Sequence, residues 1–169
     1  AASPSGERKN SNSSDGEYWW GSGYSLQEQD TAGAVDILAP TILPTTDIHG
    51  SGGYSDANYY MWFSGTSCAS PYAAGVAALV RSVNSGLSPA EVRNIITSTA
   101  TDMTINTYEG WDYWTGYGLV NAYQAVLAAN PYLPQCKIVY PINNTGFVIN
   151  SLIPVRVEAS DLDDRSVTE

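Results

Sequence analysis

A serine in a run of small residues is the first candidate for nucleophilic chemistry in this sequence. Ser67 follows Gly65 and Thr66, where a short aromatic segment gives way to an alanine-rich one. A nucleophilic serine needs an exposed Oγ and backbone N–H groups that can stabilise an oxyanion. A helix N-terminus supplies such N–H groups and a favourable dipole. The commoner role of serine or threonine at this place is a helix cap, so local features leave catalysis and capping both open.

The base that would activate Ser67 limits the catalytic schemes. An α/β-hydrolase elbow requires Gly-x-Ser-x-Gly, with Asp and His after the serine. Here the last position is Ala69, and the only histidine, His49, precedes Ser67 in a Gly/Ser-rich turn. Neither lysine, Lys9 or Lys137, stands in a Ser-x-x-Lys motif. We therefore expect an acid and a base that both come before the serine, outside this chain, with His49 as a solvated loop residue.

The elements around Ser67 can be predicted from the hydrophobic pattern. Residues 34–40 are typical of a short buried strand that ends at a proline, and residues 59–63 of a second short strand. A helix is expected from Ser67 to about Val83. Its many alanines leave little side-chain bulk on several faces, so we expect it to be central and buried.

Two further helices and one long loop complete this region. Ser88, Pro89 and Glu91 predict a capping box that starts a helix with an apolar face through residue 99. Residues 119–129 predict a third helix, which ends before a proline. The polar, turn-rich residues 1–30 predict a surface loop. We expect the aromatic residues 18–20 to pin this loop to the core, and the alternative is that they bind a ligand.

Three segments carry a resemblance to a known family. Residues 65–75, GTSCASPYAAG, resemble the serine-region signature of the subtilisin family, Gly-Thr-Ser-x-Ala-[Ser/Thr]-Pro-His-Val-Ala-Gly. Residues 35–40, VDILAP, are similar to the strand before the serine loop, and residues 116–122, GYGLVNA, to the element near the end of the domain. Among the departures from the family pattern, Tyr72 replaces a structural His and Thr41 replaces the Gly after Ala-Pro.

The resemblance implies a function and a fold. It implies an α/β, three-layer subtilisin-like fold with a partial parallel sheet, and a serine endopeptidase that cleaves polypeptides through an acyl-enzyme on Ser67. Ser67 is implied to be the nucleophile, and its own backbone N–H an oxyanion donor. The family's catalytic Asp and His and its oxyanion Asn would precede Ala1, so the chain alone is expected to be inactive. An extracellular or cell-surface location is implied as well. The alternative is a non-catalytic subtilisin-like scaffold or adhesin.

The last part of the chain differs in composition. We expect residues 1–130 to be the C-terminal half of the peptidase domain, 131–136 a linker, and 137–169 the truncated beginning of an immunoglobulin-like β-sandwich. Residues 138–140 and 154–159 predict its first strands, and further such modules are expected in the same protein. Asp161, Asp163 and Asp164 fit a hydrophilic turn better than a calcium loop. No cofactor is evident, and the resemblance leaves structural calcium open.

Charge and composition exclude several functions. The formal net charge of −10 and the pI near 4.2 argue against a nucleic-acid partner. No apolar run reaches the length of a membrane span. Two cysteines, Cys68 and Cys136, make no disulfide framework or metal-binding pattern, and Cys68 is expected to be a small buried thiol.

Overall fold

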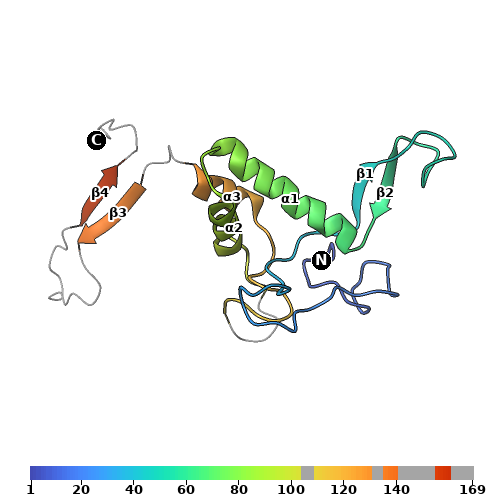
Figure 1. The fold of residues 1–169 in the computed structure, drawn as a ribbon, viewed down its shortest axis with the longest axis horizontal. Helices are drawn as coiled ribbons and strands as arrows, with labels where there is room; N and C mark the ends of the chain where they lie inside the picture. Colours follow the sequence, from blue (N-terminus) through green and yellow to red (C-terminus); the bar gives the residue numbers. More distant parts are fainter. Residues whose placement is uncertain (104–108, 131–134, 141–154, 161–169) are drawn as a thin grey trace. The chain divides into compact units, whose positions relative to one another are not determined.

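The computed structural model describes residues 1–103, 109–130, 135–140 and 155–160 (Figure 1). The chain forms two compact units, Ala1–Ala129 and Asn130–Glu169. The first contains the strands β1 (Leu43–Thr46) and β2 (Tyr59–Phe63) and the helices α1 (Thr66–Val83), α2 (Pro89–Ser98) and α3 (Ala122–Ala129). The second contains the strands β3 (Gln135–Tyr140) and β4 (Arg156–Ser160). No helix in the described ranges is both long and apolar enough to cross a membrane.

The helices agree closely with the sequence predictions. α1 and α2 begin and end within a residue of the expected positions. The capping box is present, because Ser88 Oγ accepts a hydrogen bond from the Glu91 N–H at 3.3 Å and the Glu91 carboxylate accepts one from the Ser88 N–H at 2.7 Å. The start of α3 at Ala122 corrects the expected start at Leu119, since the N–H and carbonyl of Leu119 pair with Thr101 instead.

The hydrophobic core lies between the three helices, which pack against one another (Figure 1). Val80 of α1 and Ala125 of α3 are fully buried. α1 was expected to be central and buried. It packs against both other helices, but most of its residues are exposed, so the expected burial is wrong for this chain. The residues of α1 that are buried are Cys68, Ala69, Val76 and Val80. The buried Cys68 thiol is as predicted.

The parallel sheet is reduced to isolated bridges. Ala2 pairs in parallel with Pro40, and Leu38 pairs in parallel with Leu119, which also pairs with Thr101 in the antiparallel sense. The predicted strand at residues 34–40 is therefore not a regular strand. It forms single bridges to a neighbour on each side, and we call these residues the bridging segment. Leu38 and Ala39 are buried in it, as expected.

A hairpin leads into α1. β2 has the bounds that the sequence predicts, and it pairs antiparallel with β1, which the sequence did not predict. The register joins Leu43 to Phe63 and Thr46 to Tyr59. β2 ends at Phe63, and α1 begins three residues later, so the geometry of Ser64 and Gly65 sets the direction of the helix.

The N-terminal loop has a polar interior. The Lys9 ammonium is fully buried and donates to the carbonyl oxygens of Asn10, Glu17 and Trp20 at 2.8, 2.6 and 3.3 Å. It also lies 3.4 Å from a carboxylate oxygen of Asp15. Of the aromatic cluster, Trp20 packs on the core as expected, whereas Tyr18 and Trp19 are 64% and 74% exposed.

The second unit shows two of the expected strands. β3 pairs antiparallel with β4, with Gln135 opposite Ser160 and Lys137 opposite Glu158. β3 starts within the segment 131–136 that was expected to be a linker, and the earlier part of that segment lies outside the described residues. The aspartates at 161, 163 and 164 also lie outside them.

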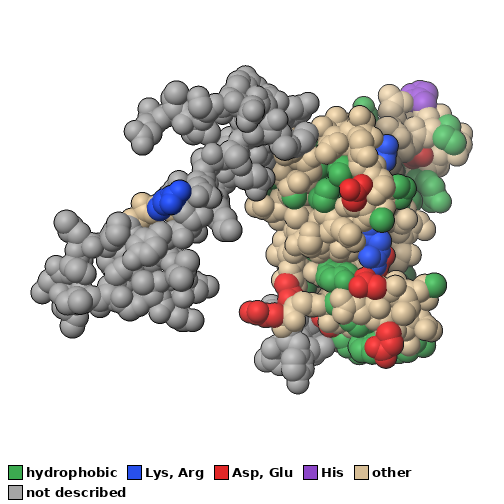
Figure 2. Space-filling view, turned by 60° about the vertical axis from the view of Figure 1, so that its left-hand side comes forward, with side chains coloured by type: hydrophobic (Ala, Val, Ile, Leu, Met, Phe, Trp, Pro, Cys, Tyr) green, Lys and Arg blue, Asp and Glu red, His purple; other side chains and the backbone are tan. Residues whose placement is uncertain are grey.

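Charged residues make up 14% of the sequence. On the face of the first unit seen in Figure 2, Asp or Glu side chains lie beside some of the Lys and Arg side chains. The described side chains on that face form no basic stripe.

Candidate active site

Ser67 is the second residue of α1 and is exposed, whereas the next residue, Cys68, is buried. The N-cap of the helix is Gly65, with φ 92° and ψ 172°. This is a backbone conformation that essentially only glycine adopts. No side chain caps this end of α1 by a hydrogen bond. The interpretation of Thr66 or Ser67 as a plain helix cap is therefore wrong, since both lie within the helix.

The Gly65 carbonyl organises the first turn. It accepts hydrogen bonds from the N–H groups of Cys68 at 3.0 Å and Ala69 at 3.4 Å. It also accepts one from the Thr41 hydroxyl at 3.0 Å. The N–H groups of Thr66 and Ser67 come before these two and have no helical carbonyl to bond. The turn thus presents an exposed hydroxyl together with N–H groups at the positive end of a helix.

The electrostatics of this helix end favour negative charge. An eighteen-residue helix carries a partial positive charge at its N-terminus, and the first turn of α1 contains no acidic residue that would offset it. An oxyanion that forms when Ser67 Oγ attacks a carbonyl would lie in this field. The arrangement can therefore stabilise the charge that develops in acyl transfer.

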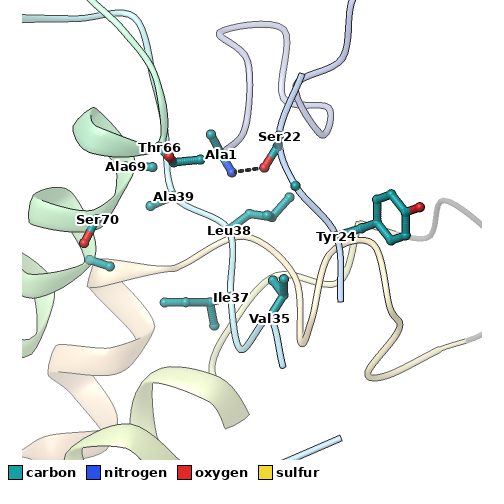
Figure 3. Close-up of a pocket in the computed structure, with 12 residues that line it drawn as sticks. Ala1, Ser22, Tyr24, Val35, Ile37, Leu38, Ala39, Thr66, Ala69 and Ser70 are labelled. Atoms are coloured by element: carbon teal, nitrogen blue, oxygen red, sulfur yellow. Dashed lines mark hydrogen bonds between the residues drawn. The ribbon is translucent and has the colours of Figure 1, made fainter. Parts of the chain in front are cut away.

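A cavity of about 380 Å³ lies beside the start of α1 (Figure 3). Thr66, Ala69, Ser70 and Ala73 line it from one face of the helix. Residues 35 and 37–39 line it from the bridging segment, and the Ala1 amino group, which donates to Ser22 Oγ at 2.7 Å, lies at its edge. Ser67 is not a lining residue, so its exposed hydroxyl belongs to another side of the helix start.

His49 is an exposed residue of the loop that joins β1 to β2. Its Nδ1 lies 2.9 Å from Oδ1 of Asn58, another residue of the same loop. The prediction of a solvated loop histidine is confirmed.

Two of the departures from the family pattern have different surroundings. Tyr72 is a half-exposed residue of α1. Thr41 is fully buried, with its N–H bonded to the Ala2 carbonyl at 3.0 Å and its hydroxyl to Gly65. Thr41 is not among the residues with a positive φ, whereas the next residue, Ile42, takes the left-handed conformation with φ 61°. The sequence showed that Thr41 departs from the family pattern. It did not reveal that Thr41 contacts residues 64–67, the turn that carries Ser67, which we call the serine turn.

A charged network ties the bridging segment to α2. The Arg93 guanidinium donates to Asp36 at 2.6 and 3.3 Å and to Asp30 at 2.7 Å. Tyr117 also donates to Asp30 at 3.0 Å. The hydrogen bonds from Arg93 and Tyr117 lower the pKa of the Asp30 carboxyl. The network therefore links Asp30 and Asp36 to α2 through Arg93.

Glycine permits close packing next to the bridge between Leu119 and Thr101. Gly118 has φ 111°, and a Cβ there would overlap the backbone of Thr101. The Leu119–Thr101 bridge therefore depends on glycine at this position.

The described residues were also compared with the side-chain clusters that bind metal ions. Among the described residues, no group of three His, Cys, Asp or Glu side chains is placed to hold a metal ion.

Comparison with known proteins places these features in one family. The model of the Subtilase family matches residues 7–118, which is more than half of the chain. Bacillopeptidase F of Bacillus subtilis is 43% identical over 103 residues, which cover 60% of this chain and 7% of that protein. A calcium-dependent protease of Trichormus variabilis is 45% identical over 82 residues, 46% of this chain and 12% of that protein.

Among solved structures, the psychrophilic subtilisin-like protease Apa1 of Pseudoalteromonas sp. AS-11 is 36% identical, with a TM-score of 0.38. That match covers 44% of this chain and 16% of Apa1. The chain thus spans only a small part of the length of its relatives. On the family match over residues 7–118, the chain belongs to the subtilase family.

Proposed function

We propose that the protein containing this chain is a serine endopeptidase in which Ser67 is the nucleophile. The observation that carries the proposal is the exposure of Ser67 at a helix N-terminus that no side chain caps. A capping serine would use its oxygen to accept a backbone N–H. Ser67 is positioned after the cap, so both its hydroxyl and its N–H remain at the helix end. Subtilase membership supports the same role.

The mechanism divides between this chain and the rest of the protein. A histidine outside this chain takes the proton from Ser67 Oγ as the oxygen attacks the peptide carbonyl. The Ser67 N–H donates to the resulting oxyanion, and the C–N bond breaks as the histidine gives its proton to the leaving amine. Water then hydrolyses the Ser67 ester and restores the hydroxyl. This chain supplies the nucleophile and one oxyanion donor.

The setting of the enzyme is part of the proposal. Polypeptides are its substrates, and an extracellular or cell-surface location fits its membership in a family whose relatives here include bacillopeptidase F. Residues 137–169 would begin an immunoglobulin-like module, for which the β3–β4 pair is the supporting observation. Structural calcium is also part of the proposal, and the supporting observation is that the Trichormus relative is named a calcium-dependent protease.

The proposal is tested in the full-length protein with Ser67→Ala. We expect peptide hydrolysis to fall by a factor of about 10³ or more, because the acyl-enzyme cannot form, with an unchanged near-ultraviolet circular dichroism spectrum. Ser82→Ala is the matched control, since Ser82 is an exposed serine at the other end of α1. Undiminished hydrolysis in Ser67→Ala would refute the nucleophile. A wild-type protein with neither hydrolysis nor fluorophosphonate labelling would favour the scaffold alternative.

A further inference from the structure

Thr41 connects the bridging segment to the turn that carries Ser67. Its hydroxyl donates to the Gly65 carbonyl at 3.0 Å, across 24 residues of sequence. Its own backbone is fixed, because its N–H donates to the Ala2 carbonyl at 3.0 Å and its side chain has no exposed surface. The hydroxyl is therefore held at a fixed place relative to the start of α1.

The Gly65 carbonyl is the group whose direction decides the geometry of the serine turn. Glycine is the most freely rotating residue, and no side chain caps this end of α1. Besides the Thr41 hydroxyl, the N–H groups of Cys68 and Ala69 bond to the Gly65 carbonyl. The peptide unit is planar and trans, so the direction of the Gly65 C=O sets the direction of the Thr66 N–H. Through the first turn it also sets the Ser67 N–H and the attachment point of its Oγ.

We propose that Thr41 is a positioning residue for Ser67, acting through its hydrogen bond to the Gly65 carbonyl. The proposal rests on the proposed function of Ser67. The bond orients the peptide that precedes Thr66, and so aims the nucleophile and its oxyanion-donating N–H at the substrate carbonyl. Thr41 itself touches neither substrate nor reacting atoms. The family pattern has glycine here, so this chain holds the turn with a side-chain hydroxyl that the pattern does not provide.

The alternative is that Thr41 stabilises the fold without affecting catalysis. A buried hydroxyl that loses its partner is costly wherever it lies, so a drop in stability does not separate the two roles. Misplacement of a reacting group by about 1 Å lowers the rate of the chemical step by a factor of about 100, without an equal effect on substrate binding. The division of the effect between kcat and KM therefore distinguishes positioning from stability.

The test uses the full-length protein with Thr41→Val, which keeps the shape and removes the hydroxyl, and Thr41→Ser, which keeps the hydroxyl. Thr115→Val is the matched control, because Thr115 is also fully buried and its hydroxyl donates to Asp112 at 2.8 Å, away from Gly65. For each variant, the Tm is measured first. The kcat, the KM and the rate of fluorophosphonate labelling are then measured at a temperature below it. Rates are divided by the folded fraction from near-ultraviolet circular dichroism.

For Thr41→Val we expect kcat and the labelling rate to fall roughly ten- to a hundredfold, with KM changed by less than about twofold. Thr41→Ser should stay within about threefold of wild type in kcat, since it can make the same bond. Thr115→Val should lower the Tm and leave kcat within about twofold of wild type.

Two results would overturn the proposal. The first is a wild-type kcat in Thr41→Val, whatever its Tm. The second is that Thr41→Val fails to fold while Thr41→Ser folds, which would make the hydroxyl a requirement of folding. Either result, together with loss of activity in Ser67→Ala, refutes only the role of Thr41. Activity that survives Ser67→Ala refutes the proposed function as well.

Discussion

Arg93 of α2 donates hydrogen bonds to both carboxylate oxygens of Asp36, at 2.6 and 3.3 Å. These bonds connect the helix to the bridging segment, which leads to the serine turn. The two side chains are 39% and 42% exposed, so solvent screens the pair. Asp30, the second acceptor of Arg93, adopts φ 60°. Solvent screening therefore limits the stability that this pair adds.

The Asp30 contacts predict a pH-dependent stability. Since the pKa of Asp30 is lowered in the folded protein by the Arg93 and Tyr117 hydrogen bonds, its contribution is present above the unfolded pKa of about 3.9 and is lost as pH falls through the folded value. Asp30→Asn should lower the Tm of the full-length protein at neutral pH. The difference from wild type should shrink in acid and in high salt. A Tm difference that is the same at pH 7 and in strong acid would refute this contribution.

The buried Lys9 ammonium predicts a large loss of stability on removal. Lys9→Met leaves three backbone carbonyls and the Asp15 carboxylate without their cation. Removal of one partner from a buried charge pair costs about 3–5 kcal/mol, which denaturant unfolding of the full-length protein can measure.

Two companion variants test this interpretation of Lys9. Arg81→Met is the control, since Arg81 also donates to backbone carbonyls but lies at the surface, and it should cost less than about 1 kcal/mol. Adding Asp15→Asn to Lys9→Met should recover part of the loss by removing the unpaired charge. Equal losses for Lys9→Met and Arg81→Met would contradict a special role of the buried ammonium.

Gly65 predicts a backbone requirement at the serine turn. A Cβ added by Gly65→Ala would lie 3.6 Å from the Ser67 nitrogen, the nearest atom outside the adjacent residues. Steric overlap is therefore not what disfavours the substitution. The conformation is the obstacle, and forcing alanine into it costs about 1–3 kcal/mol or shifts the turn. We expect lower stability together with lower kcat. Gly52→Ala, in the exposed hairpin loop, should stay within about 0.5 kcal/mol of wild type. A fully active and stable Gly65→Ala would show that the turn tolerates other geometries.

We expect His49 to have no role in catalysis. Because its ring bonds to Asn58 within an exposed loop, His49→Ala in the full-length protein should leave kcat/KM within about twofold of wild type. The isolated 169-residue chain should neither hydrolyse peptides nor react quickly with a fluorophosphonate, since we propose that the histidine that activates Ser67 lies outside it. Loss of activity in a folded His49→Ala variant would reopen the question of which histidine activates Ser67.

Local signals made the helices predictable. The capping box from Ser88 to Glu91 and the repeat of Val92 and Ile96 on one face are contained within α2 itself, so they could be recognised without a partner. The start of α3 could not be recognised in the same way. Leu119 fits a helix by composition, but its backbone bonds to Thr101, and such a long-range pairing leaves no local trace. β1 escaped prediction for the same reason, since residues 43–46 become a strand only by pairing with β2.

The candidate site shows the same limit. The motif around Ser67 identified the family, yet local sequence could not separate a nucleophile from a helix cap, because the difference depends on the conformation of Gly65. The contact of Thr41 with Gly65 spans 24 residues and was not readable from either segment. The exposed side of α1 was also unexpected, since small residues indicate close packing only where another element is present to cover them.

The most direct test of the proposed nucleophile is to identify the residue that a fluorophosphonate modifies in the active full-length protein. Peptide mass spectrometry after labelling should find one stoichiometric adduct, on Ser67, with hydrolysis lost in proportion to labelling. An adduct on another serine, or complete inactivation with Ser67 unmodified, would contradict the account.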